Sequence, residues 1–345
     1  MKNRQSFRLL ISDISAVKLM LIFMVITGSS VINDLRGQVA EAFKPGGKPE
    51  ARIFTSLGTT FSNGENHNKF DLTRAYLGYG YNFSQRLSAR IVYDVADPSA
   101  GKLKFTGMLK FALLKYQTDR WTITGGMIPL PEYDYGDKKW GYRYVFKPSH
   151  DEYGFGTSAD LGLSAAYKIN SWMSADMTIM NGEGYKLTEA DSTFKTAAGI
   201  TLLPLKNLSL RGYYDIMTGS GINQHTTEII ASYESKQFTL SMAYNYRKNQ
   251  NLEEGRDYQG ISFNGTVTLS EKMRLFGRYD YVTSTIAGNG HESWNQNKDG
   301  RLFIAGLEFA LAPGVNISPN YQGWNPAGPE MSFISRFLLS LDLKL

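Results

Sequence analysis

Hydrophobic and polar residues alternate along most of the chain, and one such stretch occurs twice. The sequence LSARIVYD at 87–94 returns as LSLRGYYD at 208–215. Because successive side chains of a strand point to opposite faces, Arg90 and Asp94 share one face, while the neighbouring leucine, isoleucine and tyrosine share the other. The pattern therefore predicts strands that are apolar on one side and charged on the other.

Two architectures fit such strands. In a soluble sheet the apolar side faces a protein core and the charges face bulk water. In a membrane barrel the apolar side faces lipid and the charges line a wet interior. The arrangement of the turns along the chain distinguishes the two.

Short turns and longer polar segments alternate along the chain. We expect seven short turns, at 83–87, 116–121, 167–172, 204–207, 233–238, 269–273 and 312–314. The longer polar segments lie at 62–69, 97–103, 129–154, 181–193, 218–225, 248–256, 284–300 and 323–329. Outer-membrane barrels have an even number of strands, with short turns at one end and long loops at the other. We therefore predict an all-β fold, a transmembrane antiparallel up-and-down β-barrel of about 16 strands.

The N-terminus has the design of a secretory signal peptide. Four basic residues precede or flank the start of an apolar run at 19–26, and small residues follow it. As a helix this run rises only about 12 Å, which is well short of the roughly 30 Å hydrocarbon core. A buried N-terminal helix is the alternative interpretation. We assign residues 1–42 to a cleaved signal peptide with a short leader, and residues 43–345 to the barrel.

Composition narrows the function without contradicting a barrel. The chain has no cysteine, so neither disulfides nor thiolate metal sites are expected, and no cofactor is implied. A mean hydropathy of −0.30 does not exclude a barrel, because each lipid-facing residue alternates with a polar one. The net charge of +5, without a basic run or a phosphate-binding loop, gives no reason to expect a nucleic-acid partner.

A sixteen-stranded barrel is too wide for side chains to fill, so its interior is expected to hold water. Strand parity predicts that charged residues of both signs line this interior. The pore-lining candidates are Arg52, Arg74, Arg90, Asp94, Lys104, Lys110, Asp160, Asp176, Arg211, Asp215, Arg278 and Asp280. The first four strands carry most of these basic residues, which predicts a basic wall there. The alternative is that these charges form structural pairs with one another.

The long segment 129–154 is rich in aromatic and acidic residues. Loops of this length usually have a function or pack against something. We expect it to fold into the barrel and narrow it, with acidic side chains facing the basic wall. The constriction candidates are Glu132, Asp134, Asp137, Asp151 and Glu152. A calcium site among the first three would lack the DxDxDG spacing, so no metal is predicted.

Several stretches resemble the Bacteroidota outer-membrane porins related to the phosphate-selective porins O and P. The similar patterns are DLTRAYLGY at 71–79, LSARIVYD at 87–94, YRY at 142–144 and GFGTSADLG at 154–162. The resemblance extends from about residue 70 to the C-terminus. It implies a sixteen-stranded pore of the bacterial outer membrane, often a homotrimer, for passive diffusion of small hydrophilic solutes or ions. It assigns no solute.

Two other functions remain open for such a barrel. One is an outer-membrane enzyme of the lipase or protease type, which needs a histidine beside a serine or an aspartate. All four histidines, His67, His150, His225 and His291, fall in predicted loops, which favours no enzyme activity. The other is a surface receptor or adhesin, which needs long external loops, yet only 129–154 and 284–300 exceed about 13 residues.

Overall fold

The computed structural model describes residues 43–96, 105–189, 193–288 and 292–345. The predicted signal peptide and leader, Lys104 and His291 lie outside these ranges. The chain divides into two compact units, Met1–Pro45 and Gly46–Leu345, and every described strand belongs to the second unit.

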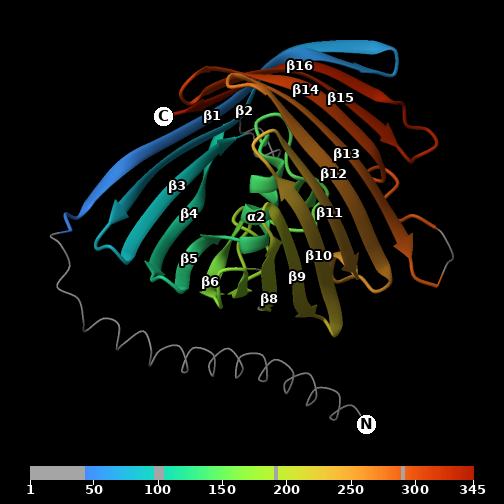
Figure 1. Ribbon diagram of the computed structural model, residues 1–345. Coiled ribbons are helices and arrows are strands. Elements are labelled where there is room, and N and C mark those ends of the chain that lie inside the picture. Colours follow the sequence, from blue (N-terminus) through green and yellow to red (C-terminus); the bar gives the residue numbers. More distant parts are fainter. Residues whose placement is uncertain (1–42, 97–104, 190–192, 289–291) are drawn as a thin grey trace, which may run out of the picture. The chain divides into compact units, whose positions relative to one another are not determined.

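Sixteen antiparallel strands form a closed barrel, which confirms the predicted fold class (Figure 1). Each strand pairs with its neighbours in the sequence, and β1 closes the ring by pairing with β16. The strands are β1 (Gly46–Ser62), β2 (Glu65–Asn82), β3 (Leu87–Ala96), β4 (Thr106–Gln117), β5 (Trp121–Pro129), β6 (Ala159–Lys168), β7 (Met173–Met180), β8 (Lys195–Leu205), β9 (Leu208–Gly219), β10 (Ile222–Glu234), β11 (Phe238–Lys248), β12 (Arg256–Ser270), β13 (Met273–Ile286), β14 (Gly300–Ala312), β15 (Val315–Pro326) and β16 (Ile334–Lys344).

The seven predicted short turns all join consecutive strands, and they lie at the same end of the barrel. The connections at the other end are less uniform than predicted. Residues 63–64 and 220–221 are two-residue turns, so the predictions of long loops at 62–69 and 218–225 were wrong. Strands β13 and β15 also run further than expected, to Ile286 and Pro326.

Backbone conformation explains the two tight turns. Asn63, Gly64, Ser220 and Gly221 all have positive φ, between 50° and 81°. This is the conformation of a type I′ hairpin turn, whose twist matches that of the flanking strands. The polar residues beside these turns are therefore paired across the hairpins, as in the register of Thr59 with Asn68. Polarity alone had suggested a loop, but the turn residues keep the chain in the sheet.

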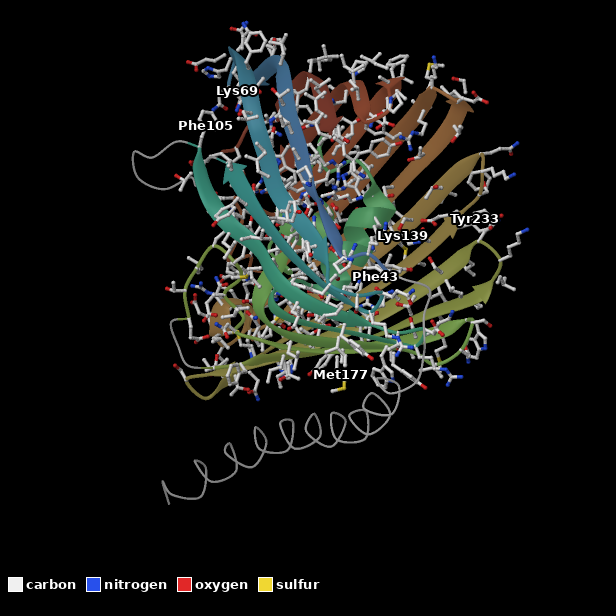
Figure 2. All side chains as sticks on the ribbon, turned by 90° about the vertical axis from the view of Figure 1, so that its left-hand side faces the viewer. Phe43, Lys69, Phe105, Lys139, Met177 and Tyr233 are labelled. Carbon is white, nitrogen blue, oxygen red and sulfur yellow. The ribbon has the colours of Figure 1, made fainter. Side chains whose placement is uncertain are left out.

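The repeated stretch has the same orientation in β3 and β9. In β9, Arg211 and Asp215 are buried while Tyr214 between them is 45% exposed. In β3, Asp94 is buried while Tyr93 is 46% exposed. Figure 2 shows this division on the whole barrel, with Met177 at its outer surface and Lys139 inside the ring. Large apolar side chains are exposed on the outer face, among them Leu57, Leu77, Ile91, Leu161, Ile229, Leu240, Phe263, Leu275, Phe303 and Leu339.

Three short helices complete the described structure. These are α2 (Pro131–Trp140) and α3 (Ser149–Glu152), both between β5 and β6, and the 3₁₀ helix η1 (Gln250–Leu252) between β11 and β12. Among the described residues, no helix has both the length and the apolar character needed to cross a membrane.

Candidate functional site

Residues 130–158, here called the inner segment, join β5 to β6 and lie inside the ring of strands (Figure 1). Helix α2 begins with Pro131, at a position where the missing N–H of proline is no loss. It ends at Gly141, whose φ of 75° suits glycine and whose N–H donates to the Asp137 carbonyl at 2.8 Å. The local sequence therefore fixes where this helix begins and ends.

Aromatic rings attach the inner segment to the wall of the barrel. Trp140, Tyr142 and Tyr144 are buried against Phe54 of β1 and Phe276 of β13. The rings of Tyr142 and Phe276 are stacked, with centroids 4.2 Å apart and planes inclined by 25°. Such contacts combine a large buried apolar area with a defined geometry, so they hold the segment in one position.

Hydrogen bonds from wall side chains reinforce this attachment. Arg278 of β13 donates to the Lys147 carbonyl at 2.6 Å, and Gln322 of β15 donates to the Val145 carbonyl at 3.0 Å. Phenol groups of the segment donate outward to the wall, as Tyr144 does to Glu308 of β14 at 2.7 Å. Tyr153 makes the equivalent bond to Asp280 of β13, at 2.9 Å, and Arg247 of β11 donates to the carbonyls of Gly154 and Phe155.

One face of α2 buries a carboxyl group against β8 to β11. Glu132 is 4% exposed, and burial raises its pKa to about 8. The groups that act on this carboxyl are Lys195, Arg211, Asp215 and Glu228. One oxygen of Glu132 and one of Glu228 are buried without a hydrogen bond from any described residue. The helix therefore carries an acid that is protonated at neutral pH on its buried side.

His150 of α3 lies beside this cluster. Its Nδ1 is 3.9 Å from Oε1 of Glu228, and its ring contacts the edge of Tyr133 at a centroid distance of 4.9 Å. Burial lowers the pKa of His150 to about 4. The imidazole is therefore neutral at physiological pH, and it fills space behind the helix.

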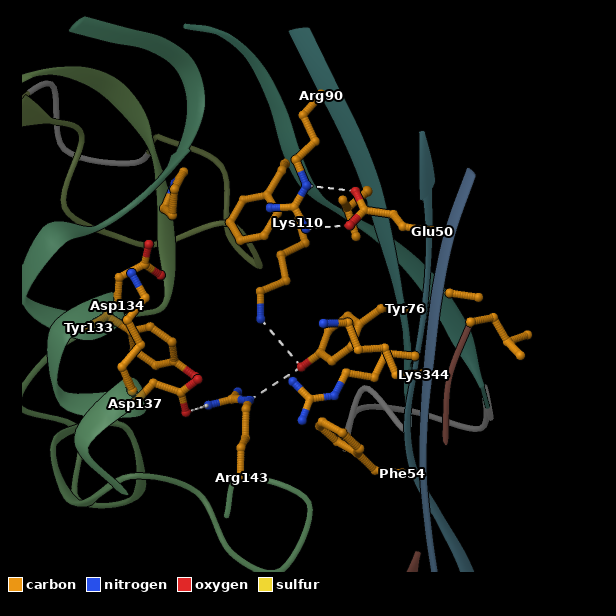
Figure 3. Close-up of a pocket in the computed structure, with 17 residues that line it drawn as sticks. Glu50, Phe54, Tyr76, Arg90, Lys110, Tyr133, Asp134, Asp137, Arg143 and Lys344 are labelled. Atoms are coloured by element: carbon orange, nitrogen blue, oxygen red, sulfur yellow. Dashed lines mark hydrogen bonds and ion pairs between the residues drawn. The ribbon is translucent and has the colours of Figure 1, made fainter. Parts of the chain in front are cut away.

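The opposite face of α2 borders a cavity of about 560 Å³ (Figure 3). The far side of this cavity is built by β1 to β4, with Arg52, Arg90 and Lys110 among its lining residues. The inner segment contributes Tyr133, Asp134, Asp137, Lys138 and Arg143. The cavity thus lies between an edge of the inner segment that carries both acidic and basic side chains and the wall that carries most of the predicted basic residues.

Three arginines of this wall are paired with carboxylates. Arg52 donates two bonds of 2.8 Å to Asp342 of β16, and Arg90 donates bonds of 2.6 and 2.8 Å to Glu50. Arg74 donates a 2.7 Å bond to Asp94. The structural pairs considered in the sequence analysis are thus present for these residues, while Arg52 and Arg90 still line the cavity.

Lys110 differs from these arginines. Its side chain is buried, and its ammonium lies over the rings of Tyr76, Phe111, Tyr133 and Tyr185 at 4.7 to 5.9 Å from the centroids. Its hydrogen-bond partner is the Tyr76 hydroxyl, at 3.4 Å. Among the described residues no carboxylate lies within ion-pair distance of this ammonium.

The predicted acids of the inner segment take different positions. Asp134 and Asp137 line the cavity, and burial raises the pKa of both, that of Asp137 to about 6. Asp151 accepts a 3.1 Å bond from Arg143, whose Nη1 also lies 3.7 Å from Asp137. Glu132 faces away from the cavity, as described above. Oε2 of Glu152 lies 3.5 Å from Nζ of Lys147.

The other predicted pore-lining residues lie elsewhere on the barrel wall. Asp176 pairs with Arg211 at 2.7 Å, Asp215 pairs with Lys195 at 3.1 Å, and Arg278 pairs with Asp280 at 2.5 Å. Asp160 accepts hydrogen bonds from the backbone N–H groups of Leu161, Gly182 and Gly184, which orders the loop after β7.

Several cavity residues were absent from the prediction. Glu50 has the same strand parity as Arg52, and a start of β1 at Gly46 would have included it. Arg143 belongs to the YRY pattern, but its position depends on the path of the inner segment. Tyr76 of β2 and Lys344 of β16 both lie in register with Arg52 of β1, on either side of it, which only the closed barrel reveals.

The structure changes the interpretation of the histidines. His67 lies in β2, His225 lies in β10 and His150 lies in α3, so the expectation that all lie in loops was wrong. None of these three makes a hydrogen bond or ion pair to a serine among the described residues; their partners are Glu65, Tyr214 and Glu228. Within the described parts of the chain, no group of three or more His, Asp or Glu residues has the arrangement of a metal site.

The closed sixteen-stranded barrel of this chain has the same fold as solved structures of outer-membrane channels. The chain is similar to the outer membrane channel DcaP of Acinetobacter baumannii, with a TM-score of 0.68 and 11% identity over 89% of this chain and 100% of that one. The anion-selective porin from Comamonas acidovorans gives a TM-score of 0.63 and 9% identity over 88% and 100% of the chains. The trimer form of in-vitro folded OmpT, an outer membrane protein of Vibrio cholerae, gives a TM-score of 0.61 and 14% identity over 88% of this chain and 100% of that one. No protein-family model and no curated relative matches the sequence.

Proposed function

We propose that this protein is an outer-membrane porin, a water-filled channel for the passive diffusion of small hydrophilic solutes or ions. The observation that carries the proposal is the position of the inner segment, which lies inside the barrel and faces the wall of β1 to β4 across the cavity. A sixteen-stranded barrel without this segment would hold a wide lumen. The segment therefore acts as a constriction.

The charges at the constriction support selection by polarity and size. Asp134 and Asp137 lie on one side together with Lys138 and Arg143, while Arg52, Arg90 and Lys110 lie on the other together with Glu50. Opposite charges separated by water create a transverse field, which orients dipolar solutes and resists apolar ones. The likeness to DcaP and the other channels supports the same function.

Single-channel recording tests the pore. We expect the purified, refolded protein to insert into planar bilayers and give discrete ohmic steps, and liposomes that contain it to swell in small sugars but not in large ones. A barrel that inserts correctly but stays electrically silent and impermeable to sugars would contradict the proposal.

Reversal potentials test the basic wall. A variant with Arg52→Gln, Arg90→Gln and Lys110→Gln, the wall cations that line the cavity, is expected to shift ion selectivity towards cations. The matched control is Lys206→Gln, Lys236→Gln and Lys272→Gln, which removes the same charge from exposed short turns. Unchanged selectivity in the first variant would exclude a role of the basic wall.

We also propose that the barrel lies in the bacterial outer membrane, with its exposed apolar face against lipid, as a homotrimer. The trimer form of OmpT from Vibrio cholerae supports this assembly, and the resemblance to the Bacteroidota porins of the O and P kind supports it independently. The mass of the detergent-solubilised complex and chemical cross-linking in the membrane test it. A monomer by both measurements would contradict the trimer.

A further inference from the structure

The cavity contains two cations that converge on a single phenol oxygen. The Lys110 ammonium and the Arg143 guanidinium each donate to the Tyr76 hydroxyl, both at 3.4 Å (Figure 3). The two donors are therefore no farther apart than twice that distance. Like charges at such a separation repel each other, and the repulsion is strong where water is scarce.

Neither cation is fully satisfied by the protein. Lys110 is 4% exposed and makes no ion pair with a described residue. Arg143 binds Asp151 through Nη2, but its Nη1 is buried without a hydrogen bond to any described residue. A buried donor without a partner is costly, so the arrangement has room for an acceptor that carries negative charge.

Aromatic rings form the immediate surroundings of the Lys110 ammonium, whereas the rest of the cavity lining is largely charged. Tyr76, Phe111 and Tyr133 surround the Lys110 ammonium, and Phe54 and Val92 line the same cavity. At about 560 Å³ the cavity is within the range of small-molecule sites. The rings beside the Lys110 ammonium favour the flat apolar body of an organic solute next to its charged group, whereas a fully hydrated inorganic anion gains little from them.

We propose that Lys110 and Arg143 form a binding site for organic carboxylates with an aryl-sized apolar body. One carboxylate oxygen accepts from Lys110 and the other from Arg143, and the body of the solute lies against Tyr133 and Phe111. The assignment rests on the proposed pore function, because it names the solutes that the constriction retains during passage.

Asp134 and Asp137 border the same cavity and oppose any anion there. Asp137 is, however, close to Arg143, with 3.7 Å between Oδ1 and Nη1. A carboxylate between Lys110 and Arg143 therefore meets two cations at close range. The acids of α2 discriminate against solutes with several negative charges, which supports monocarboxylates as the ligand class.

The test compares benzoate with three probes on the wild-type protein in detergent, by isothermal titration calorimetry. The probes are benzyl alcohol, which lacks the charge, benzylamine, which reverses it, and inorganic phosphate, which lacks the apolar body. We expect benzoate to bind at least tenfold more tightly than each of them. Equal affinity for phosphate or for benzyl alcohol would overturn the proposal.

Two variants test whether benzoate binds beside Lys110. Lys110→Met keeps the length of the side chain among the same rings and is expected to weaken benzoate binding at least tenfold. The matched control is Lys138→Met, which removes a charge from the same cavity at an exposed position and should leave binding within twofold. Unchanged binding in the first variant would overturn the assignment, and the wild-type probe series remains decisive if that variant does not fold.

Bilayer recording separates this inference from the proposed function. If both hold, benzoate reduces the single-channel current of the wild type but not of Lys110→Met. Binding by calorimetry without any channel current would contradict the pore while leaving the site in place. A conducting channel without benzoate binding would overturn the site alone.

Discussion

Arg74 of β2 and Asp94 of β3 form a buried ion pair, with 2.7 Å between Nη1 and Oδ2. The Tyr185 hydroxyl, from the loop between β7 and β8, donates to the same carboxylate oxygen at 2.7 Å. The single acid that the sequence places among the basic residues of the first strands is therefore occupied by one of them. Arg52 and Arg90 are paired with Asp342 and Glu50, so Lys110 is the cavity-lining cation of this wall that has no carboxylate within ion-pair distance among the described residues.

Asp94→Asn is expected to destabilise the barrel. It leaves the Arg74 guanidinium, whose side chain is 11% exposed, as a buried charge without its carboxylate. Breaking a buried pair in this way costs about 3–5 kcal/mol. Urea unfolding in lipid vesicles measures the loss. The double variant Asp94→Asn with Arg74→Gln should recover much of the lost free energy of unfolding. A loss of less than about 1 kcal/mol in Asp94→Asn alone would mean that the pair does not stabilise the barrel.

The attachment of the inner segment should weaken as the pH rises from about 4.5 to about 8. Burial raises the pKa of Glu132 to about 8 from an ordinary value of 4.5. The attached segment therefore binds more protons than the detached one between these values, and attachment loses up to about 1.4 kcal/mol per pH unit across that window. The facing groups are Lys195, Arg211, Asp215 and Glu228.

His150 limits the pH range in which the effect of Glu132 on attachment can be measured. Burial lowers its pKa to about 4 from 6.5, so its contribution grows as the pH rises through that range and opposes that of Glu132. Above about 6.5 Glu132 acts without this opposition. Hydrogen exchange of residues 131–152, corrected for intrinsic rates, should show lower protection at pH 8 than at pH 6.5. Glu132→Gln should reduce the difference, with Glu228 beside it accounting for the remainder, and an equal difference in that variant would contradict the assignment.

Trp140→Ala should release the inner segment without unfolding the barrel. The indole packs on Phe276 and Tyr142 and donates to the Phe146 carbonyl at 2.7 Å. Truncating such a buried ring costs about 3–5 kcal/mol. We expect larger and noisier single-channel currents, with unchanged β-sheet content by circular dichroism. Trp140→Phe keeps most of the apolar contact and should give a smaller change. Identical, quiet currents in the wild type and in both variants would show that Trp140 does not hold the inner segment in place.

Ile229→Arg tests which face of the barrel meets lipid. This side chain is 49% exposed on the outer face of β10. An arginine on the lipid face near the middle of the membrane costs about 2–4 kcal/mol. Leu187→Arg is the control, because Leu187 is 68% exposed but lies in the loop between β7 and β8. Folding into lipid vesicles should be impaired only for the first variant, and equal effects would contradict the orientation.

Strand parity was predictable because it depends on neighbouring residues alone. Arg90, Asp94, Arg211 and Asp215 point inward in the structure as alternation requires, and Tyr214 points outward. The number of strands followed from the alternation of turns. The two hairpins at residues 63–64 and 220–221 were misjudged, although the Asn63-Gly64 pair is itself a hairpin signal.

The amino-acid sequence by itself determined the strands, their apolar and charged faces, and the segment that enters the barrel, because each of these is encoded within a few consecutive residues. Only the tertiary structure decided which charges meet. Arg52 pairs with Asp342, 290 positions away, because β1 and β16 close the ring in one particular register. Lys110 gains its aromatic surroundings from strands and from two separate loops. Contacts between elements so distant in the chain depend on the whole barrel being closed.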